Sequence, residues 1–184
     1  MGLKLEIINP MQYAGWDELL LTNKGYSFFH SSYWANVLCK SYNYTPRYFT
    51  IITENRLQAL IPLMEINSIL TGKRGVALPF SDYCNIIISD KFDLNETIDC
   101  LIDYGDKAGW KSMEIRDSSI FSQGLPYTSQ YYHHELNLTK DTDHIFTCFG
   151  ENNRRNIKKA MKGGVTVNIL NSLESIKEFY RLNC

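Results

Sequence analysis

Residues 48–65 read YFTIITENRLQALIPLME and contain two β-rich runs separated by a turn. The runs Tyr48–Thr53 and Leu57–Glu65 are rich in aliphatic, aromatic and β-branched residues, and Glu54-Asn55-Arg56 between them suits a hairpin. Pro62 has no N–H to offer a strand ladder, so we expect it at a sheet edge or at a bulge. The stretch therefore predicts two strands that pair in one sheet.

Further helices and strands are expected on both sides of this hairpin. Leu94–Ala108 is the clearest helix, because its apolar residues share one stripe and Gly109 follows as a terminator. A second helix is expected from a Ser31 or Ser32 cap to about Ser41. The other expected helices are 11–21, 142–149, 152–162 and 172–182, and the other expected strands are 3–8, 75–78, 86–88, 113–116, 134–138 and 165–170. This order of elements predicts an α/β or α+β fold around a mixed sheet.

The composition of the 184-residue chain excludes several classes of protein. With 44% hydrophobic and 13% aromatic residues, the chain has enough apolar material to exclude intrinsic disorder. A formal net charge of −1 gives no global attraction to nucleic acid or to a membrane. No run of ~18 apolar residues predicts a membrane span, and the N-terminus lacks a signal peptide. We expect a soluble, cytoplasmic chain without a disulfide framework or a metal site, because its cysteines and histidines lack the required spacing.

The two ends of the chain resemble each other. Leu5–Met11 and Val167–Leu173 share a pattern, and each runs into an amphipathic helix. Either any strand that enters a capped helix gives this pattern by chance, or the chain carries a duplicated unit. On the second interpretation, residues 1–164 form one domain and residues 165–184 form the truncated start of another. Such a truncated unit is expected to expose the apolar face of its last strand and helix, and therefore to dimerise or aggregate.

Four short segments follow one another along nearly the whole chain: FFHSSYW at 28–34, ALIPL at 59–63 with LPFSDY at 78–83, NRRNIKKA at 153–160 before VTV at 165–167, and EFYRL at 178–182. In this order and spacing they resemble the Fem-type acyltransferases, non-ribosomal peptidyltransferases with a duplicated GNAT-like fold. The resemblance implies a GNAT-like mixed sheet flanked by helices, followed by the first strand and helix of a second such unit. It also implies transfer of an aminoacyl or acyl group, from aminoacyl-tRNA or acyl-CoA, to an amine acceptor such as a cell-wall precursor.

A cluster of cations marks the helix expected at 152–162. Arg154, Lys158 and Lys162 recur every fourth residue, with Arg155 and Lys159 beside them, and like charges at this spacing repel each other by ~0.2–0.5 kcal/mol per pair. An anion such as a phosphate, a diphosphate-linked precursor or a tRNA backbone would relieve the repulsion. The equal alternative is a solvated helix face anchored on its other side by Ile157 and Met161. The candidate anion-binding residues are Arg154, Arg155, Lys158 and Lys159.

The loop expected after the strand 75–78 combines aromatic, hydroxyl and carboxylate groups. Such a loop often lines a cleft, where Asp82 would orient an amine or bind a sugar and Tyr83 would stack. The alternative is that Asp82 caps a turn while the aromatic residues fill the core. Arg116 and Asp117 either face the same cleft or form a surface ion pair, and the ion pair is favoured. The candidate substrate-binding residues are Phe80, Asp82, Tyr83 and Arg116.

Some expected signatures of acyl transfer are absent from the sequence. The Q/R-x-x-G-x-G/A run that binds acetyl-CoA in ordinary GNAT enzymes does not occur, and Gly163-Gly164 follows the basic helix as a stop signal. No cofactor is therefore evident for this chain, and no residue is identified as a catalytic base. Two alternatives to a transferase remain: a non-catalytic module that binds an anion or forms a homodimer, and a nucleic-acid binder that uses the basic helix.

Overall fold

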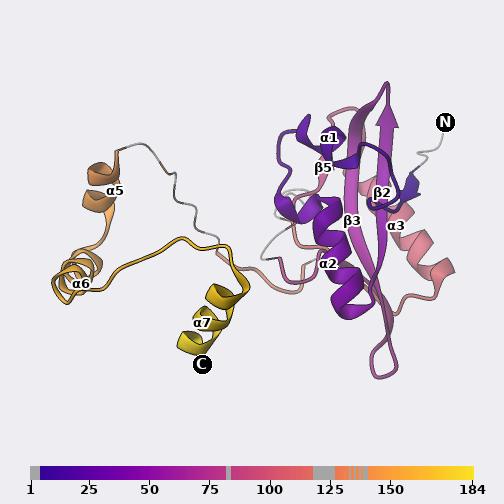
Figure 1. Cartoon of the computed structure of the whole chain (residues 1–184). Coiled ribbons are helices and arrows are strands. Elements are labelled where there is room, and N and C mark those ends of the chain that lie inside the picture. The colour runs from indigo at the N-terminus through magenta and orange to yellow at the C-terminus, as the bar shows by residue number, and fades with distance from the viewer. Residues whose placement is uncertain are drawn as a thin grey trace. The chain divides into compact units, whose positions relative to one another are not determined.

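The computed structural model describes residues 5–81, 84–117, 127–132, 134, 136, 138 and 141–184 (Figure 1). By its internal contacts the chain divides into two compact units, Met1–Gln130 and Tyr131–Cys184. The domain boundary expected after residue 164 rests on the suggested duplication and not on internal contacts, so it stays a prediction. None of the described helices is both long enough and apolar enough to cross a lipid bilayer.

The first unit contains a mixed sheet, as the sequence predicts. Its strands run in the order β1-β2-β3-β4-β6, and β5 pairs with β3 beside this path. All neighbours are antiparallel except β4 and β6, which run parallel with Val76 opposite Glu114. The strands are β1 (Glu6–Ile8), β2 (Thr45–Thr53), β3 (Arg56–Ser68), β4 (Gly72–Ala77), β5 (Ile87–Ile88) and β6 (Ser112–Glu114).

The hairpin of β2 and β3 forms where residues 48–65 predict it. Glu54 and Asn55 make the turn with φ angles of 51° and 57°, a left-handed conformation that Asn tolerates better than most residues. Pro62 lies in the middle of β3, at the point where the strand paired with β3 on one side changes from β5 to β4. β5 pairs with β3 as far as Leu60, and β4 begins to pair at Leu63. The proline thus lies at a gap in the ladder on that side, which is why a central strand tolerates it.

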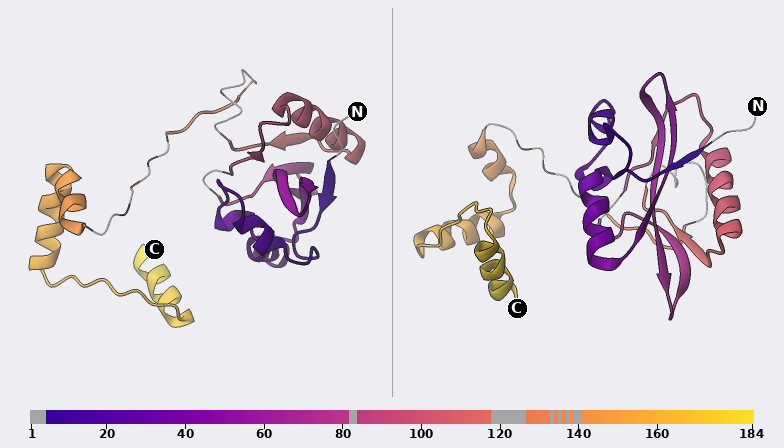
Figure 2. Two further views of the ribbon diagram at one scale, coloured as in Figure 1. Left: turned by 90° about the horizontal axis from the view of Figure 1, so that it is seen from above. Right: turned by 45° about the vertical axis from the view of Figure 1, so that its right-hand side comes forward.

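Helices cover both faces of the sheet (Figures 1 and 2). On one face lie α1 (Trp16–Leu21) and α2 (Ser32–Tyr42), with a short 3-10 helix, Phe28–His30, between them; on the other lies α3 (Leu94–Ala108). Ser31 caps α2 by accepting a hydrogen bond from the Trp34 N–H, as expected. The helix expected over 11–21 begins only at Trp16, because Gly15 precedes it with a φ of 74°.

Trp110 fixes the distance between α3 and the sheet. Its ring lies so close to Gly75 of β4 that a Cβ added there would be 2.2 Å from the ring atom Cζ3. A Cβ added at Gly105 of α3 would be 3.1 Å from the same ring. Its indole N–H donates a 2.8 Å hydrogen bond to the buried carboxylate of Glu65, which also pairs with Arg47 and Lys73. The two glycines therefore provide the space for the indole.

The second unit consists of α5 (Thr142–Cys148), α6 (Glu151–Lys162) and α7 (Leu173–Asn183). The strand expected at 165–170 is wrong, because none of these residues lies in a strand. The strand expected at 134–138 is also wrong for its described residues 134, 136 and 138, which lie outside any strand. A strand needs a partner, and the alternation of 165–170 finds none among the described residues. Large apolar side chains of this segment and of α7 are exposed; they include Val167, Ile169, Leu170, Leu173, Ile176, Phe179 and Leu182.

Candidate functional site at the carboxyl ends of two parallel strands

The parallel pair β4 and β6 brings two predicted site segments together. A connection that contains α3 carries the chain from β4 to β6, so both strands end at the same edge of the sheet. In α/β folds, ligands bind preferentially at such carboxyl ends. The chain leaves β4 into the loop 78–86 and leaves β6 through residues 115–117. These two segments form the candidate site.

Arg116 joins the two segments. Its Nη1 donates a 2.9 Å hydrogen bond to the carbonyl oxygen of Ser81, and its own carbonyl accepts one of 2.8 Å from the Cys84 N–H. Its Nε donates to Glu114 at 2.6 Å. Arg116 thus forms an ion pair with Glu114, a partner that the sequence analysis did not name. Asp117 accepts a hydrogen bond from the Ile86 N–H. The guanidinium keeps further N–H groups that no described hydrogen bond uses.

The loop after β4 has an unusual backbone. Leu78 has a φ of 31° and Phe80 a φ of 66°, both in the region that side-chain-bearing residues avoid. The Ser81 hydroxyl holds the turn by donating a 2.6 Å hydrogen bond to the Leu78 carbonyl. Leu78 is fully buried, whereas Phe80 is 58% exposed. The alternative in which the aromatic residues of this loop fill the core therefore does not apply to Phe80.

Two aromatic residues that sequence reasoning missed lie beside Phe80. Its ring centroid is 4.7 Å from that of Tyr42 at the end of α2, and the Tyr42 ring stacks on Tyr44 at 5.4 Å. The three rings form a partly exposed aromatic row next to the loop. Asp82 and Tyr83, the other predicted residues of this loop, lie outside the described residues.

A buried histidine fixes the far end of the loop. The Ser27 N–H donates to Nδ1 of His30 at 3.0 Å, so Nε2 carries the proton and donates to the Asn85 carbonyl at 2.9 Å. Burial lowers the pKa of His30, against the opposing effects of the hydrogen bonds to Asn85 and Ser27 and of the charge of Asp117. Burial likewise raises the pKa of the Cys84 thiol. Both groups are enclosed and hold structure, so neither is suited to act as a base or nucleophile on a bound substrate.

The cations predicted to bind an anion lie on α6 in the second unit. Arg155, Lys158 and Lys159 are exposed and Arg154 is half-buried; within the described part of the chain, none of them forms an ion pair. Lys158 Nζ lies 5.8 Å from the centroid of the Phe146 ring. Ile157 is half-buried and Met161 is largely exposed, so the helix has only a weak apolar anchor. The arrangement fits both an anion site and a solvated face.

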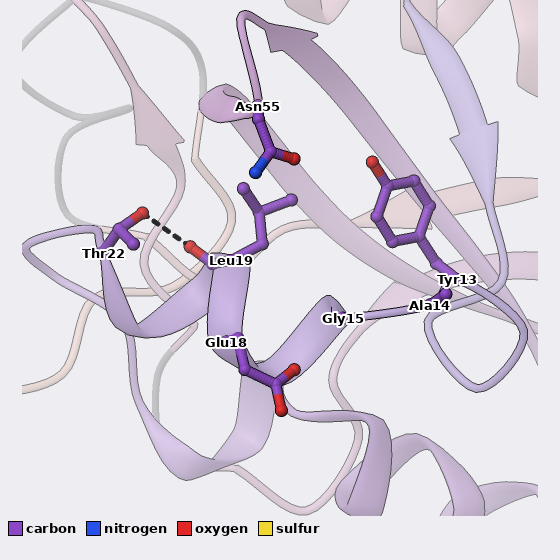
Figure 3. A pocket seen from close by; sticks show the side chains of 7 residues that line it. All are labelled: Tyr13, Ala14, Gly15, Glu18, Leu19, Thr22 and Asn55. Atoms are coloured by element: carbon purple, nitrogen blue, oxygen red, sulfur yellow. Dashed lines mark hydrogen bonds between the residues drawn. The ribbon is translucent and has the colours of Figure 1, made fainter.

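Two surface hollows are lined by none of the predicted site residues, although the smaller one lies on α6 beside the predicted cations. The larger, about 320 Å³, lies between α1 and the β2–β3 turn and is lined by Tyr13, Ala14, Gly15, Glu18, Leu19, Thr22 and Asn55 (Figure 3). The Thr22 hydroxyl is already engaged with the Leu19 carbonyl at 2.7 Å. The smaller hollow, about 230 Å³, is lined by Phe149, Asn153, Asn156 and Ile157. Neither hollow gathers a set of groups suited to catalysis.

Comparison with known proteins gives only structural similarity. No family model and no curated protein matches the chain. A ribosomal-protein-alanine N-acetyltransferase from Brucella melitensis biovar Abortus 2308 is similar over 75% of this chain and 100% of its own, with a TM-score of 0.45 and 10% identity. A glucosamine-6-phosphate N-acetyltransferase from Arabidopsis thaliana is similar over 73% of this chain and 100% of its own, with a TM-score of 0.41 and 17% identity. At these identities the similarity is one of backbone arrangement alone.

Proposed function

We propose that this chain takes part in the transfer of an aminoacyl or acyl group to an amine, as a Fem-type, GNAT-like transferase unit. The acceptor binds at the carboxyl ends of β4 and β6, and a cell-wall precursor is the candidate acceptor. The hydrogen bond from Arg116 to the Ser81 carbonyl carries the proposal, because it joins the loop 78–86 to the end of β6. The sequence resemblance to the Fem-type enzymes supports the reaction class.

The chemistry fits a site that works by positioning. The amine nitrogen attacks the acyl carbon of an ester or thioester; a C–N bond forms, the C–O or C–S bond breaks, the amine proton passes to water and the leaving group takes up a proton. Holding the two reactants in contact supplies much of the rate enhancement for such a step. Arg116 has N–H groups that no hydrogen bond among the described residues uses, and these are suited to hold a carbonyl or anionic group of the acceptor, while Phe80 offers an exposed ring.

The donor is proposed to be aminoacyl-tRNA or acyl-CoA, each of which carries phosphates. The cations of α6 lack acidic partners among the described residues, and three of them are exposed while Arg154 is half-buried. They support phosphate contact by Arg154, Arg155, Lys158 and Lys159. Arg offers two parallel N–H groups to a phosphate, and Lys offers a point charge.

The test is a transfer assay on the full chain, with charged tRNA or acyl-CoA as donor and a panel of amino sugars, lysine peptides and cell-wall precursors as acceptors. Arg116→Ala is expected to lower kcat/KM roughly 10- to 100-fold through misplacement of the loop. The matched control is Arg56→Ala, an exposed arginine at the β2–β3 turn, which is expected to leave activity unchanged. Absence of transfer with every donor and acceptor would contradict the proposal, and full activity of Arg116→Ala would place the acceptor elsewhere.

The donor site needs its own variant. Lys158→Glu with Lys159→Glu is expected to raise KM for the donor without changing that for the acceptor. If the same variant abolishes binding of uncharged RNA of every sequence while no transfer is found, a nucleic-acid binder is the better description.

The second candidate is a non-catalytic module that forms a homodimer. The exposed apolar side chains of α7 and of residues 165–170 favour it, because patches of this kind usually mark contact surfaces. Ile176→Ser with Phe179→Ser should then shift sedimentation from dimer to monomer, whereas Tyr33→Ser, at an exposed position of α2, should not. A chain that is monomeric at all concentrations contradicts this candidate.

A further inference from the structure

The hairpin of β3 and β4 ends in two aliphatic side chains that are almost wholly exposed. Ile69 is fully exposed and Leu70 is 94% exposed at its tip. The hairpin projects beyond the ends of α2 and α3 (Figures 1 and 2). Its turn is well formed, since the Ser68 hydroxyl accepts hydrogen bonds of 3.3 Å from the Leu70 and Thr71 N–H groups. The ladder continues to the base of the turn, with Ser68 opposite Gly72. A rigid stem thus presents two aliphatic side chains that give the fold no burial.

Cations surround the stem of this hairpin. Lys73 and Arg74 lie on β4 next to the turn, and Arg47 lies on β2. The Lys111 side chain crosses Gly72: a Cβ added at this glycine would be 2.7 Å from Cδ and Cε and 3.0 Å from Nζ. Within the described part of the chain, Glu65 is the only carboxylate that forms ion pairs with these four cations. It pairs with Arg47 at 3.2 Å and with Lys73 at 3.1 Å. Four cations therefore face one acid, and Arg74 and Lys111 have no described ion pair.

We propose that Ile69 and Leu70 insert into the surface of an anionic lipid bilayer. Aliphatic side chains gain by leaving water for the acyl region, and each Lys or Arg near an anionic surface adds attraction. The charge pattern favours an anionic bilayer over an apolar protein groove, because the cations stand behind the tip where lipid headgroups would lie. The net charge of the whole chain is −1, so the attraction is local to this hairpin. The proposal is independent of the transferase reaction.

The test is flotation of the full chain with vesicles of phosphatidylcholine alone or mixed with phosphatidylglycerol. Binding is expected to the mixed vesicles only and to weaken with salt. Ile69→Ser with Leu70→Ser is expected to lower binding on the order of tenfold or more. Lys111→Ala is expected to lower it about fivefold. The matched control is Leu21→Ser, an exposed leucine at the end of α1, which should bind as the wild type does.

A fluorescence measurement separates the hairpin from the basic helix α6, which also carries exposed cations. Trp16 and Trp110 are buried and Trp34 is half-buried, so a Leu70→Trp variant adds the one indole at an exposed tip, and its spectrum is read as the difference from that of the wild type. Its emission is expected to shift to the blue on addition of the mixed vesicles, and the shift should persist in Arg155→Glu with Lys159→Glu.

Three results would overturn the proposal. Equal binding to both kinds of vesicle would show that the cations do not contribute to binding. Unchanged binding of the serine variant would show that Ile69 and Leu70 do not insert into the bilayer. Loss of self-association in the serine variant, without any lipid binding by the wild type, assigns the tip to a second copy of the chain. Thermal unfolding of the variants should match that of the wild type, because neither tip side chain is buried.

Discussion

The Arg116 guanidinium and the Ser81 carbonyl oxygen lie 2.9 Å apart, across 35 residues of sequence. This bond and the 2.8 Å bond from the Cys84 N–H to the Arg116 carbonyl hold the loop after β4 against the end of β6. The conformation of the loop, with its left-handed Leu78 and Phe80, therefore depends on a residue that follows a strand distant in sequence.

Arg116→Ala should loosen this loop without unfolding the chain. We expect the free energy of unfolding to fall by about 1 kcal/mol, since the lost hydrogen bonds are partly open to water. Hydrogen exchange at the Cys84 amide should accelerate well beyond this global effect. Arg56→Ala serves as control, and equal exchange rates in the two variants would show that Arg116 does not hold the loop.

His30 should make the chain less stable as the pH falls. Its pKa in the folded state lies below its usual value of 6.5, mainly because of burial. The unfolded chain thus takes up a proton as the pH drops through 6.5, while the folded chain resists it, so stability is lost from there down to the folded pKa. Urea unfolding at a series of pH values measures this loss.

His30→Asn should remove that part of the pH dependence. It should also lower stability at pH 7.5 by about 2 kcal/mol, because the Asn85 carbonyl loses its donor. His144→Asn, at an exposed position of α5, is the control and should keep the wild-type slope. A wild-type slope in His30→Asn would rule out His30 as its source.

Glu65 should stabilise the chain above its unfolded pKa. Burial alone raises the pKa of Glu65, but hydrogen bonds from Trp110 and Lys73 and the charge of Arg47 outweigh burial and lower it below 4.5. Its contribution is complete above about pH 4.5 and is lost as the pH falls through the lowered value.

Glu65→Gln should therefore cost about 2 kcal/mol at pH 7 and progressively less in acid. The cost is moderate because the Arg47 and Lys73 side chains, each 35% exposed, keep part of their hydration. Glu114→Gln, which alters an exposed ion pair, should cost less than ~1 kcal/mol. A difference that does not shrink with falling pH would contradict this account.

Gly75→Ala should force the Trp110 ring from its place, because the added Cβ would stand 2.2 Å from it. We expect a loss of about 2 kcal/mol in chemical denaturation. Gly105→Ala should cost less, since its Cβ would lie 3.1 Å away and alanine favours a helix. Combined with Trp110→Leu, Gly75→Ala should cost less than the sum of the two single changes; strict additivity would show that the ring is not the obstacle.

Local signals in the sequence predicted much of the first unit. Ser31, Gly109 and the turn at Glu54-Asn55 act through their own backbone or cap, so their effect can be predicted from the neighbouring residues. The position of Pro62 depends on where β5 ends and β4 begins, and only the three-dimensional pairing shows this. The strand expected at 165–170 failed for the same reason: alternation indicates a preference, but a strand exists only beside a partner.

Only the residue types of the candidate site could be taken from the sequence, and its residues stay a prediction. The residue types of the loop after β4 drew attention to Phe80, and the end of a strand drew it to Arg116. The hydrogen bond between Arg116 and Ser81 could not be inferred, because it depends on the parallel pairing of β4 with β6. Tyr42 and Tyr44 were missed because they are linked to the loop through the contact of Tyr42 with Phe80, which joins residues far apart in the chain.

The parallel pairing of β4 and β6 also sets an order of assembly. The β2–β3 hairpin closes over a two-residue turn, whereas Arg74 meets Ser112 only after a long intervening segment has been ordered. The entropy of closing a loop grows with its length, so the hairpin should nucleate early and the parallel pair should dock late. The edge next to Arg116 and Phe80 would then be the last part of the sheet to form, and a nascent chain would complete the candidate site only after the rest of the sheet is in place.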